Sequence, residues 1–227
     1  MDNFSFKGIS STSFNIIVNS LPPISKPAMR VEETEIDGVD GTIFEDLGYE
    51  SYDKKIKITI TENNIDKLIS WLNGEGNLVL SNEPDKYYKA KVISKIDFER
   101  LIKYEPVEVT FRVQPFKYKN ELKEFNIAKE TSIDVYNLGN TISKPIITIT
   151  GTGNIEVSLN GNHQFTLSMI EDNIITLDSE KQDAYYGTTL KNRKMNGEFI
   201  NLNIGKNQIS WTGSITKIEI NNQSRWI

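Results

Sequence analysis

The sequence of 227 residues contains no cysteine and a single histidine, His163. Without cysteine the chain has no disulfide framework, no thiolate nucleophile, no iron–sulfur cluster and no cysteine-ligated zinc. One histidine does not supply the paired imidazoles that dominate hydrolytic zinc sites. The enzyme chemistry that remains is carboxylate catalysis, a serine–histidine pair built on His163, or a Mg²⁺ or Ca²⁺ ion with oxygen ligands. Composition therefore favours a binding or structural protein.

The chain also has no basic block and no long apolar run. It carries 26 basic and 31 acidic residues, a net charge of −5, with 17 against 21 in residues 1–125 and 9 against 10 in residues 126–227. A nucleic-acid backbone or an anionic membrane is therefore not an expected partner. No apolar run approaches the ~18 residues of a membrane span, and the first residues do not resemble a signal peptide. We expect a soluble chain that is made in the cytoplasm.

Apolar residues alternate with polar ones in several segments, which predicts half-buried strands. The alternation is clearest at Ile56, Ile58 and Ile60, and again from Val107 to Val113. Further strands are predicted over residues 88–93, 146–150, 155–159, 165–169, 174–177 and 215–220. Asn160-Gly161 predicts a tight hairpin turn, because a type I′ turn needs two positive φ angles. Asn- and Gly-rich turns are predicted over residues 73–77, 137–140 and 203–207. The sequence thus indicates an all-β protein.

One segment has helical spacing instead. Its apolar residues fall at i, i+3, i+4 and i+7, with Gly74 as a stop signal; they are Ile65, Leu68, Ile69 and Leu72. Asn63 or Asn64 is the predicted N-cap. Trp71 lies beside this apolar stripe, so we expect it to pack rather than to bind a ligand.

Residues 30–53 form a loop-rich excursion in which acidic residues precede Asp37-Gly38-Val39-Asp40-Gly41. Loops of this length inside a compact domain are usually functional, so we expect an interaction arm here. The charged stretch 117–129 is the predicted domain boundary.

The candidate chemical sites have weak patterns. His163 follows the predicted hairpin turn, where exposed polar residues are the default. Asp37 and Asp40 share a Gly-rich loop and offer carboxylates to Ca²⁺, but their spacing matches no EF-hand loop, which favours a turn. Asp178, Glu180 and Asp183 offer carboxylates for glycoside hydrolysis, against a solvated loop. Gly151-Thr152-Gly153 leads into a strand, so no helix N-terminus follows it to hold a phosphate.

Eight segments occur in an order and spacing that together form a distinctive pattern. They begin with Phe6-Lys7-Gly8-Ile9-Ser10-Ser11 and continue through residues 14–18, 36–41, 48–49, 71–78, 87–92, 109–118 and 137–153. In this pattern the chain resembles the distal tail proteins (Dit) of siphophages that infect Gram-positive bacteria. Val39 departs from the family, in which a basic or polar residue is expected there.

The resemblance implies two domains, an N-terminal β-sandwich with one short helix (residues 1–125) and a C-terminal galectin-like β-sandwich (residues 126–227). It implies a homohexameric ring at the virion tail tip, which joins the tail tube protein to a tail-associated hub or lysin protein and lets DNA pass. The tape-measure protein is a further partner; no cofactor, metal or membrane is expected. The arm and the strand at 107–113 are the candidate subunit contacts, with Glu32, Glu33, Asp37, Gly38, Asp40, Gly41, Val107, Val109 and Phe111 as their residues.

Two other functions stay open at this point. A carbohydrate-binding module or adhesin would recognise a bacterial cell-wall glycan through Tyr185, Tyr186 or Trp211, because aromatic rings stack on sugars. A wall hydrolase would use the carboxylates named above. The absence of a convincing catalytic set favours a protein that is not an enzyme.

Overall fold

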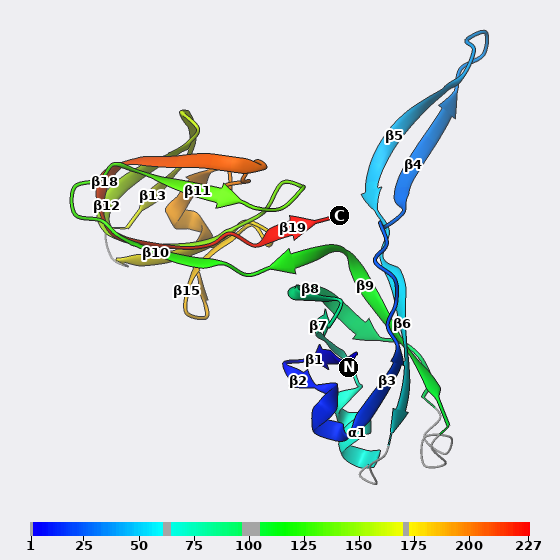
Figure 1. The fold of residues 1–227 in the computed structure, drawn as a ribbon. Coiled ribbons are helices and arrows are strands. Elements are labelled where there is room, and N and C mark those ends of the chain that lie inside the picture. Colours follow the sequence, from blue (N-terminus) through cyan, green and yellow to red (C-terminus); the bar gives the residue numbers. More distant parts are fainter. Residues whose placement is uncertain (1, 61–64, 97–104, 170–172) are drawn as a thin grey trace. The chain divides into compact units, whose positions relative to one another are not determined.

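The computed structural model describes residues 2–60, 65–96, 105–169 and 173–227, which divide into two compact units. The first unit runs to Lys117, and the second from Tyr118 to Trp226. Strands make up most of both units, and α1 is the one α-helix among the described residues, which confirms the predicted all-β fold class (Figure 1). The division between Lys117 and Tyr118 falls within a strand, whereas the boundary expected from the sequence lies between residues 125 and 126. No helix in the described ranges is long and apolar enough to cross a membrane.

The sheet of the first unit has the strand order β2-β1-β7-β8-β9-β6-β3. The elements of this unit are β1 (Phe4–Phe6), β2 (Ile9–Ser10), the 3₁₀ helix η1 (Ser11–Phe14), β3 (Ile16–Ser20), β4 (Met29–Glu35), β5 (Thr42–Tyr49), β6 (Tyr52–Ile60), α1 (Ile65–Trp71), β7 (Glu75–Leu80), β8 (Glu83–Val92) and β9 (Val107–Lys119). Ile56 of β6 lies opposite Val109 of β9, and both side chains are fully buried. The alternating pattern of the sequence therefore marks the core face of these strands correctly.

Helix α1 covers this core through Leu68 and Trp71. The Trp71 ring stacks on Phe14 with 4.6 Å between centroids, and its Nε1 donates a hydrogen bond of 2.8 Å to the Phe6 carbonyl oxygen. The prediction that Trp71 packs is confirmed. Ile69 was expected on the same buried face, which is wrong, because its side chain is 43% exposed. The predicted caps Asn63 and Asn64 lie outside the described residues.

The second unit has its own core and the main strand order β10-β18-β12-β14-β15-β16. Its elements are β10 (Leu122–Asn126), β11 (Ser132–Asn137), β12 (Ile146–Leu159), β13 (Asn162–Ser168), β14 (Ile174–Asp178), β15 (Asp183–Tyr186), β16 (Thr189–Leu190), the 3₁₀ helix η2 (Asn192–Lys194), β17 (Met195–Gly197), β18 (Gly205–Asn221) and β19 (Ser224–Trp226). The turn between β12 and β13 has φ angles of 51° at Asn160 and 82° at Gly161, as predicted for this pair.

Strand β12 corrects one sequence interpretation. Residues 146–150 and 155–159 were predicted as two strands with a loop between them, yet β12 is continuous and shifts register against β18 around Gly151. A Cβ atom at Gly151 would lie 2.4 Å from the Ser214 carbonyl oxygen, so only glycine lets the two backbones approach this closely. The glycines are therefore a bulge inside a strand.

The charged and Asn-rich segments also contain more strand than the sequence predicts. The stretch 117–129 includes β10, while β7 and β18 begin inside the clusters at residues 73–77 and 203–207. Tertiary pairing in a sheet overrides the weak β-propensity of Asn and Gly at these positions.

Candidate functional site: the acidic hairpin

The predicted arm is a β-hairpin and not a loop. Strands β4 and β5 pair with each other as a separate two-stranded sheet in the described part of the chain (Figure 1). Two hydrogen bonds of 2.8 Å close its base, from the Glu50 amide to the Ala28 carbonyl and from Arg30 Nη2 to the Leu47 carbonyl. Gly38 and Gly41 have φ angles of 82° and 91°, which lets the chain reverse between the strands. We call residues 29–49 the acidic hairpin.

Charge in the acidic hairpin is almost all of one sign. Its seven carboxylates and one guanidinium, Arg30, give a net charge of −6, so the rest of the chain carries +1 of the total of −5. Glu32 and Glu45 lie directly opposite each other across the two strands. Like charges in this position destabilise strand pairing, so the repulsion between these two carboxylates weakens the hairpin.

The acidic hairpin also exposes large apolar side chains on both faces. Ile43 and Phe44 are neighbours in β5, so they point to opposite faces of the two-stranded sheet. Phe44 is 64% exposed, and the other exposed apolar residues are Met29, Val31, Ile36, Val39, Ile43 and Leu47. None of the side chains of β4 or β5 is buried. An isolated two-stranded hairpin is at best marginally stable in water, so these features suit a segment that is completed by contact with another surface.

The structure brings most of the predicted contact residues together. Glu32, Glu33, Asp37, Gly38, Asp40 and Gly41 all lie in the acidic hairpin and are exposed. Val107, Val109 and Phe111 instead belong to the core of the first unit. Their side chains have no surface to offer a neighbour, and we do not carry them into the proposed contact.

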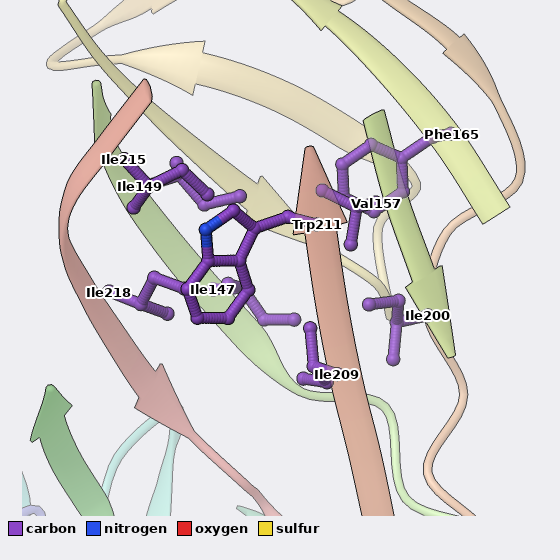
Figure 2. A pocket seen from close by; sticks show the side chains of 9 residues that line it. All are labelled: Ile147, Ile149, Val157, Phe165, Ile200, Ile209, Trp211, Ile215 and Ile218. Carbon is purple, nitrogen blue, oxygen red and sulfur yellow. The ribbon is translucent and has the colours of Figure 1, made fainter. Parts of the chain in front are cut away.

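The three aromatic residues considered for glycan binding likewise differ in their exposure. Tyr185 and Tyr186 lie on β15, and Tyr186 is 51% exposed. Trp211 is 6% exposed and lines an apolar void of about 10 Å³ inside the second unit, among Ile147, Ile149, Val157, Phe165, Ile200, Ile209, Ile215 and Ile218 (Figure 2). A void of this size has no room for a sugar. Trp211 is a core residue, so we no longer consider it a candidate glycan contact.

The carboxylates considered for catalysis have structural partners. Asp178 Oδ1 accepts hydrogen bonds of 3.0 Å from the amides of Glu180 and Lys181, which fixes a turn after β14. Asp183 Oδ1 accepts a bond of 3.1 Å from Asn192 Nδ2. His163 is exposed on β13. Among the described residues, no three His, Asp or Glu side chains gather as metal ligands would.

Sequence reasoning missed a buried charged cluster beside the acidic hairpin. Lys54 of β6, Glu83 of β8 and Lys117 of β9 are all buried, and the Lys117 ammonium lies 2.7 Å from Glu83 Oε1. The Tyr88 hydroxyl donates a 2.7 Å bond to Glu83 Oε2, and burial together with this bond raises the pKa of Tyr88. A signal was present, since Lys54 occupies an inward position of the alternating segment that continues with Ile56, Ile58 and Ile60.

Comparison with known proteins finds similarity to phage tail proteins in part of the sequence and in the fold. Residues 8–113, which make up most of the first unit, match the family model described as phage tail protein RIFT-related domain. No curated protein matches the sequence.

The whole chain is similar in fold to solved tail proteins of phages. One is the SPP1 Dit protein, whose structure is described as a paradigm of the hub adsorption apparatus in phages that infect Gram-positive bacteria. It has 15% identity and a TM-score of 0.75, and each chain is fully covered. Chains from two structures of the phage p2 baseplate in its activated conformation, with Sr and with Ca, have 10% identity, a TM-score of 0.60 and 97% coverage of both chains. The predicted resemblance to siphophage distal tail proteins is confirmed.

Proposed function

We propose that this protein is a structural component of the tip of a phage tail, or of a phage-like tail, and that it is not an enzyme. Six copies form a ring that joins the tail tube protein to a tail-associated hub or lysin protein, next to the tape-measure protein, and DNA passes through the ring. The chain is made in the cytoplasm of the host bacterium and ends in the virion tail tip. The match of residues 8–113 to the tail-protein family model and the full-length similarity in fold to distal tail and baseplate chains support this proposal.

The acidic hairpin is the observation that carries the proposed assembly. Among the described residues it pairs with no other strand, and it buries none of its side chains and exposes apolar residues on both faces. A surface of this kind, rimmed by charged residues, is typical of a protein interface. Head-to-tail contacts, in which one patch meets a different patch on the next copy, close into a ring when the rotation fits. The hairpin of each copy therefore contacts the next copy of the chain.

The test is the mass of the purified protein as a function of concentration, with negative-stain images of the assembled species. We expect a sixfold ring in the wild type. Phe44→Gln should raise the concentration needed for assembly by about tenfold or more, because loss of a buried aromatic contact costs more than 1.4 kcal/mol. The matched control is Leu190→Gln, since Leu190 is also 64% exposed but lies in the second unit. A monomer at every concentration would overturn the ring, and equal effects of both variants would overturn the role of the hairpin.

Glycan recognition remains a second candidate on one observation, the exposed ring of Tyr186 beside Tyr185 on β15. Binding of the full chain to purified cell-wall glycan, and its loss in Tyr186→Ala, would support a carbohydrate-binding module or adhesin. Absence of binding by the wild type would dismiss it.

A further inference from the structure

The two ends of the acidic hairpin are tied together by one buried lysine. Lys54 follows β5 by five residues and is only 1% exposed. Its Nζ donates a hydrogen bond of 3.1 Å to the carbonyl oxygen of Pro23, in the segment that connects β3 to β4. The bond therefore joins the chain that leaves the hairpin to the chain that enters it.

The groups that contact the Lys54 ammonium are a backbone carbonyl oxygen and two aromatic rings. Both oxygens of Glu83 already accept a bond, one from Lys117 and one from Tyr88. Lys54 Nζ lies over the rings of Tyr88 and Tyr52, at 4.8 and 5.4 Å from their centroids. Aromatic faces attract a desolvated cation, so the Pro23 carbonyl and the two rings hold the ammonium in one place.

A buried ammonium fills this space at the cost of desolvating a charge. Removing a charge of this size from water costs several kcal/mol, and an apolar side chain of similar volume is often at least as stable. What an apolar side chain does not provide is a directed bond to the Pro23 carbonyl. The nearby bond of 3.2 Å from Asn82 Nδ2 to the Pro22 carbonyl holds the same segment from a second side.

We propose that Lys54 is a positioning residue for assembly, which fixes the direction of the acidic hairpin by holding the Pro22–Pro23 segment against β6. The rigid Pro-Pro pair transmits this anchor toward β4, because proline fixes its own φ and restricts the residue before it. The inference rests on the proposed function only for its effect on the ring. The direction of the hairpin is a property of each single copy.

The absence of cysteine makes a direct test simple. Spin labels on Asp40→Cys, in the turn of the hairpin, and Glu75→Cys, at the exposed start of β7, report the distance between hairpin and sheet. The protein is kept at a dilution at which it is monomeric. We expect one narrow distance in the parent protein, and loss of that single peak in Lys54→Met. Lys57→Met is the control, because it makes the same change at an exposed position of the same strand.

Hydrogen exchange of the Glu50 amide, which bonds to Ala28 at the base of the hairpin, provides a second measurement. Lys54→Met should speed this exchange by about tenfold, the size expected for loss of a bond to a charged donor, while the amides of β9 keep their protection. Should Lys54→Met fail to fold, Asn82→Ala, at an exposed position, is expected to change both measurements in the same direction.

The outcomes separate the two proposals. An unchanged distance peak and unchanged Glu50 exchange in the folded variants would overturn the role of Lys54, whether or not the wild type forms a ring. A wild type that never assembles would overturn the proposed function and leave the distance result standing. If both proposals hold, Lys54→Met also raises the concentration needed for assembly, and Lys57→Met does not.

Discussion

Asn207 illustrates how much order a single side chain supplies in the second unit. It is fully buried, and its amide nitrogen donates bonds of 2.8 and 3.1 Å to the carbonyl oxygens of Asn203 and Gly205. Its Oδ1 accepts a bond of 3.0 Å from the Asn203 amide and one of 3.3 Å from Asn160 Nδ2. One amide thus holds the bend before β18 and links it to the β12–β13 turn.

Replacing Asn207 by alanine should therefore lower the free energy of unfolding by about 2–4 kcal/mol, because it leaves several backbone groups without partners. Urea unfolding measures this change. Asn196→Ala, at an exposed position of β17, serves as control and should stay within about 0.5 kcal/mol of the wild type. Equal effects of the two variants would contradict the role of the Asn207 network.

Lys54 gives a pH dependence of defined sign. Burial lowers its pKa from the ordinary 10.5; Glu83 opposes the shift and Lys117 adds to it. At a pH between the pKa of Lys54 in the folded chain and its pKa in the unfolded chain, the unfolded chain binds more protons. The contribution of Lys54 to the free energy of unfolding therefore rises with pH. Unfolding curves from neutral pH to pH 10.5 should show the wild type gaining stability relative to Lys54→Met. A difference that is constant over this range would be inconsistent with a lowered pKa.

At the scale of elements, the acidic hairpin contains a repulsive pair that can be relieved without touching its apolar residues. Glu32→Gln removes the charge opposite Glu45, whereas Glu33→Gln removes one opposite Phe44. We expect the first variant to stabilise β4–β5 pairing by about 0.2–1 kcal/mol, seen as slower hydrogen exchange of the hairpin amides in the monomer. The second is the matched control, and an equal slowing in both would show that net charge matters and the pair does not.

The elements also show where sequence reasoning succeeds and where it fails. Ile56, Ile58 and Ile60 alternate because one face of β6 meets the core, and period two is then visible in the sequence. Strands β4 and β5 bury neither face, so their acidic and apolar residues carry no such period and were interpreted as a loop. The bulge at Gly151 was taken for a break, because a glycine in a strand and a glycine in a loop look alike without the Ser214 backbone beside it.

The position of the candidate site could be predicted from the sequence, but its residues were predicted only in part. Acidic residues and Gly38 and Gly41 mark an exposed excursion, so its position was visible in the sequence. Val109 and Phe111 were assigned to a contact although their alternation is the signature of burial. The link from Lys54 to Pro23 spans 31 residues and depends on where β6 lies, which no local pattern encodes.

For the whole molecule, the distribution of charge predicts how salt affects assembly. The acidic hairpin holds −6 while the remaining chain holds +1, so the proposed ring would gather six strongly negative segments with little positive charge to balance them. Salt screens such repulsion, with a Debye length that falls from about 10 Å at 0.1 M to about 3 Å at 1 M. Added NaCl should lower the concentration at which the ring assembles, as followed by light scattering.

Glu32→Gln and Glu33→Gln should both weaken this salt dependence, since each removes one charge from every copy. Assembly that becomes weaker with added salt would instead indicate ion pairs between the hairpin and a basic surface, against the repulsion argued here.

The independence of the acidic hairpin from both cores has an evolutionary consequence. A substitution in a core strand must satisfy neighbours on several sides, and most such changes destabilise the fold. The hairpin contributes no side chain to either core, so its sequence can drift without loss of folding and can adjust to a changed neighbour. Such a segment lets an assembly acquire new partners while the body that carries it stays the same.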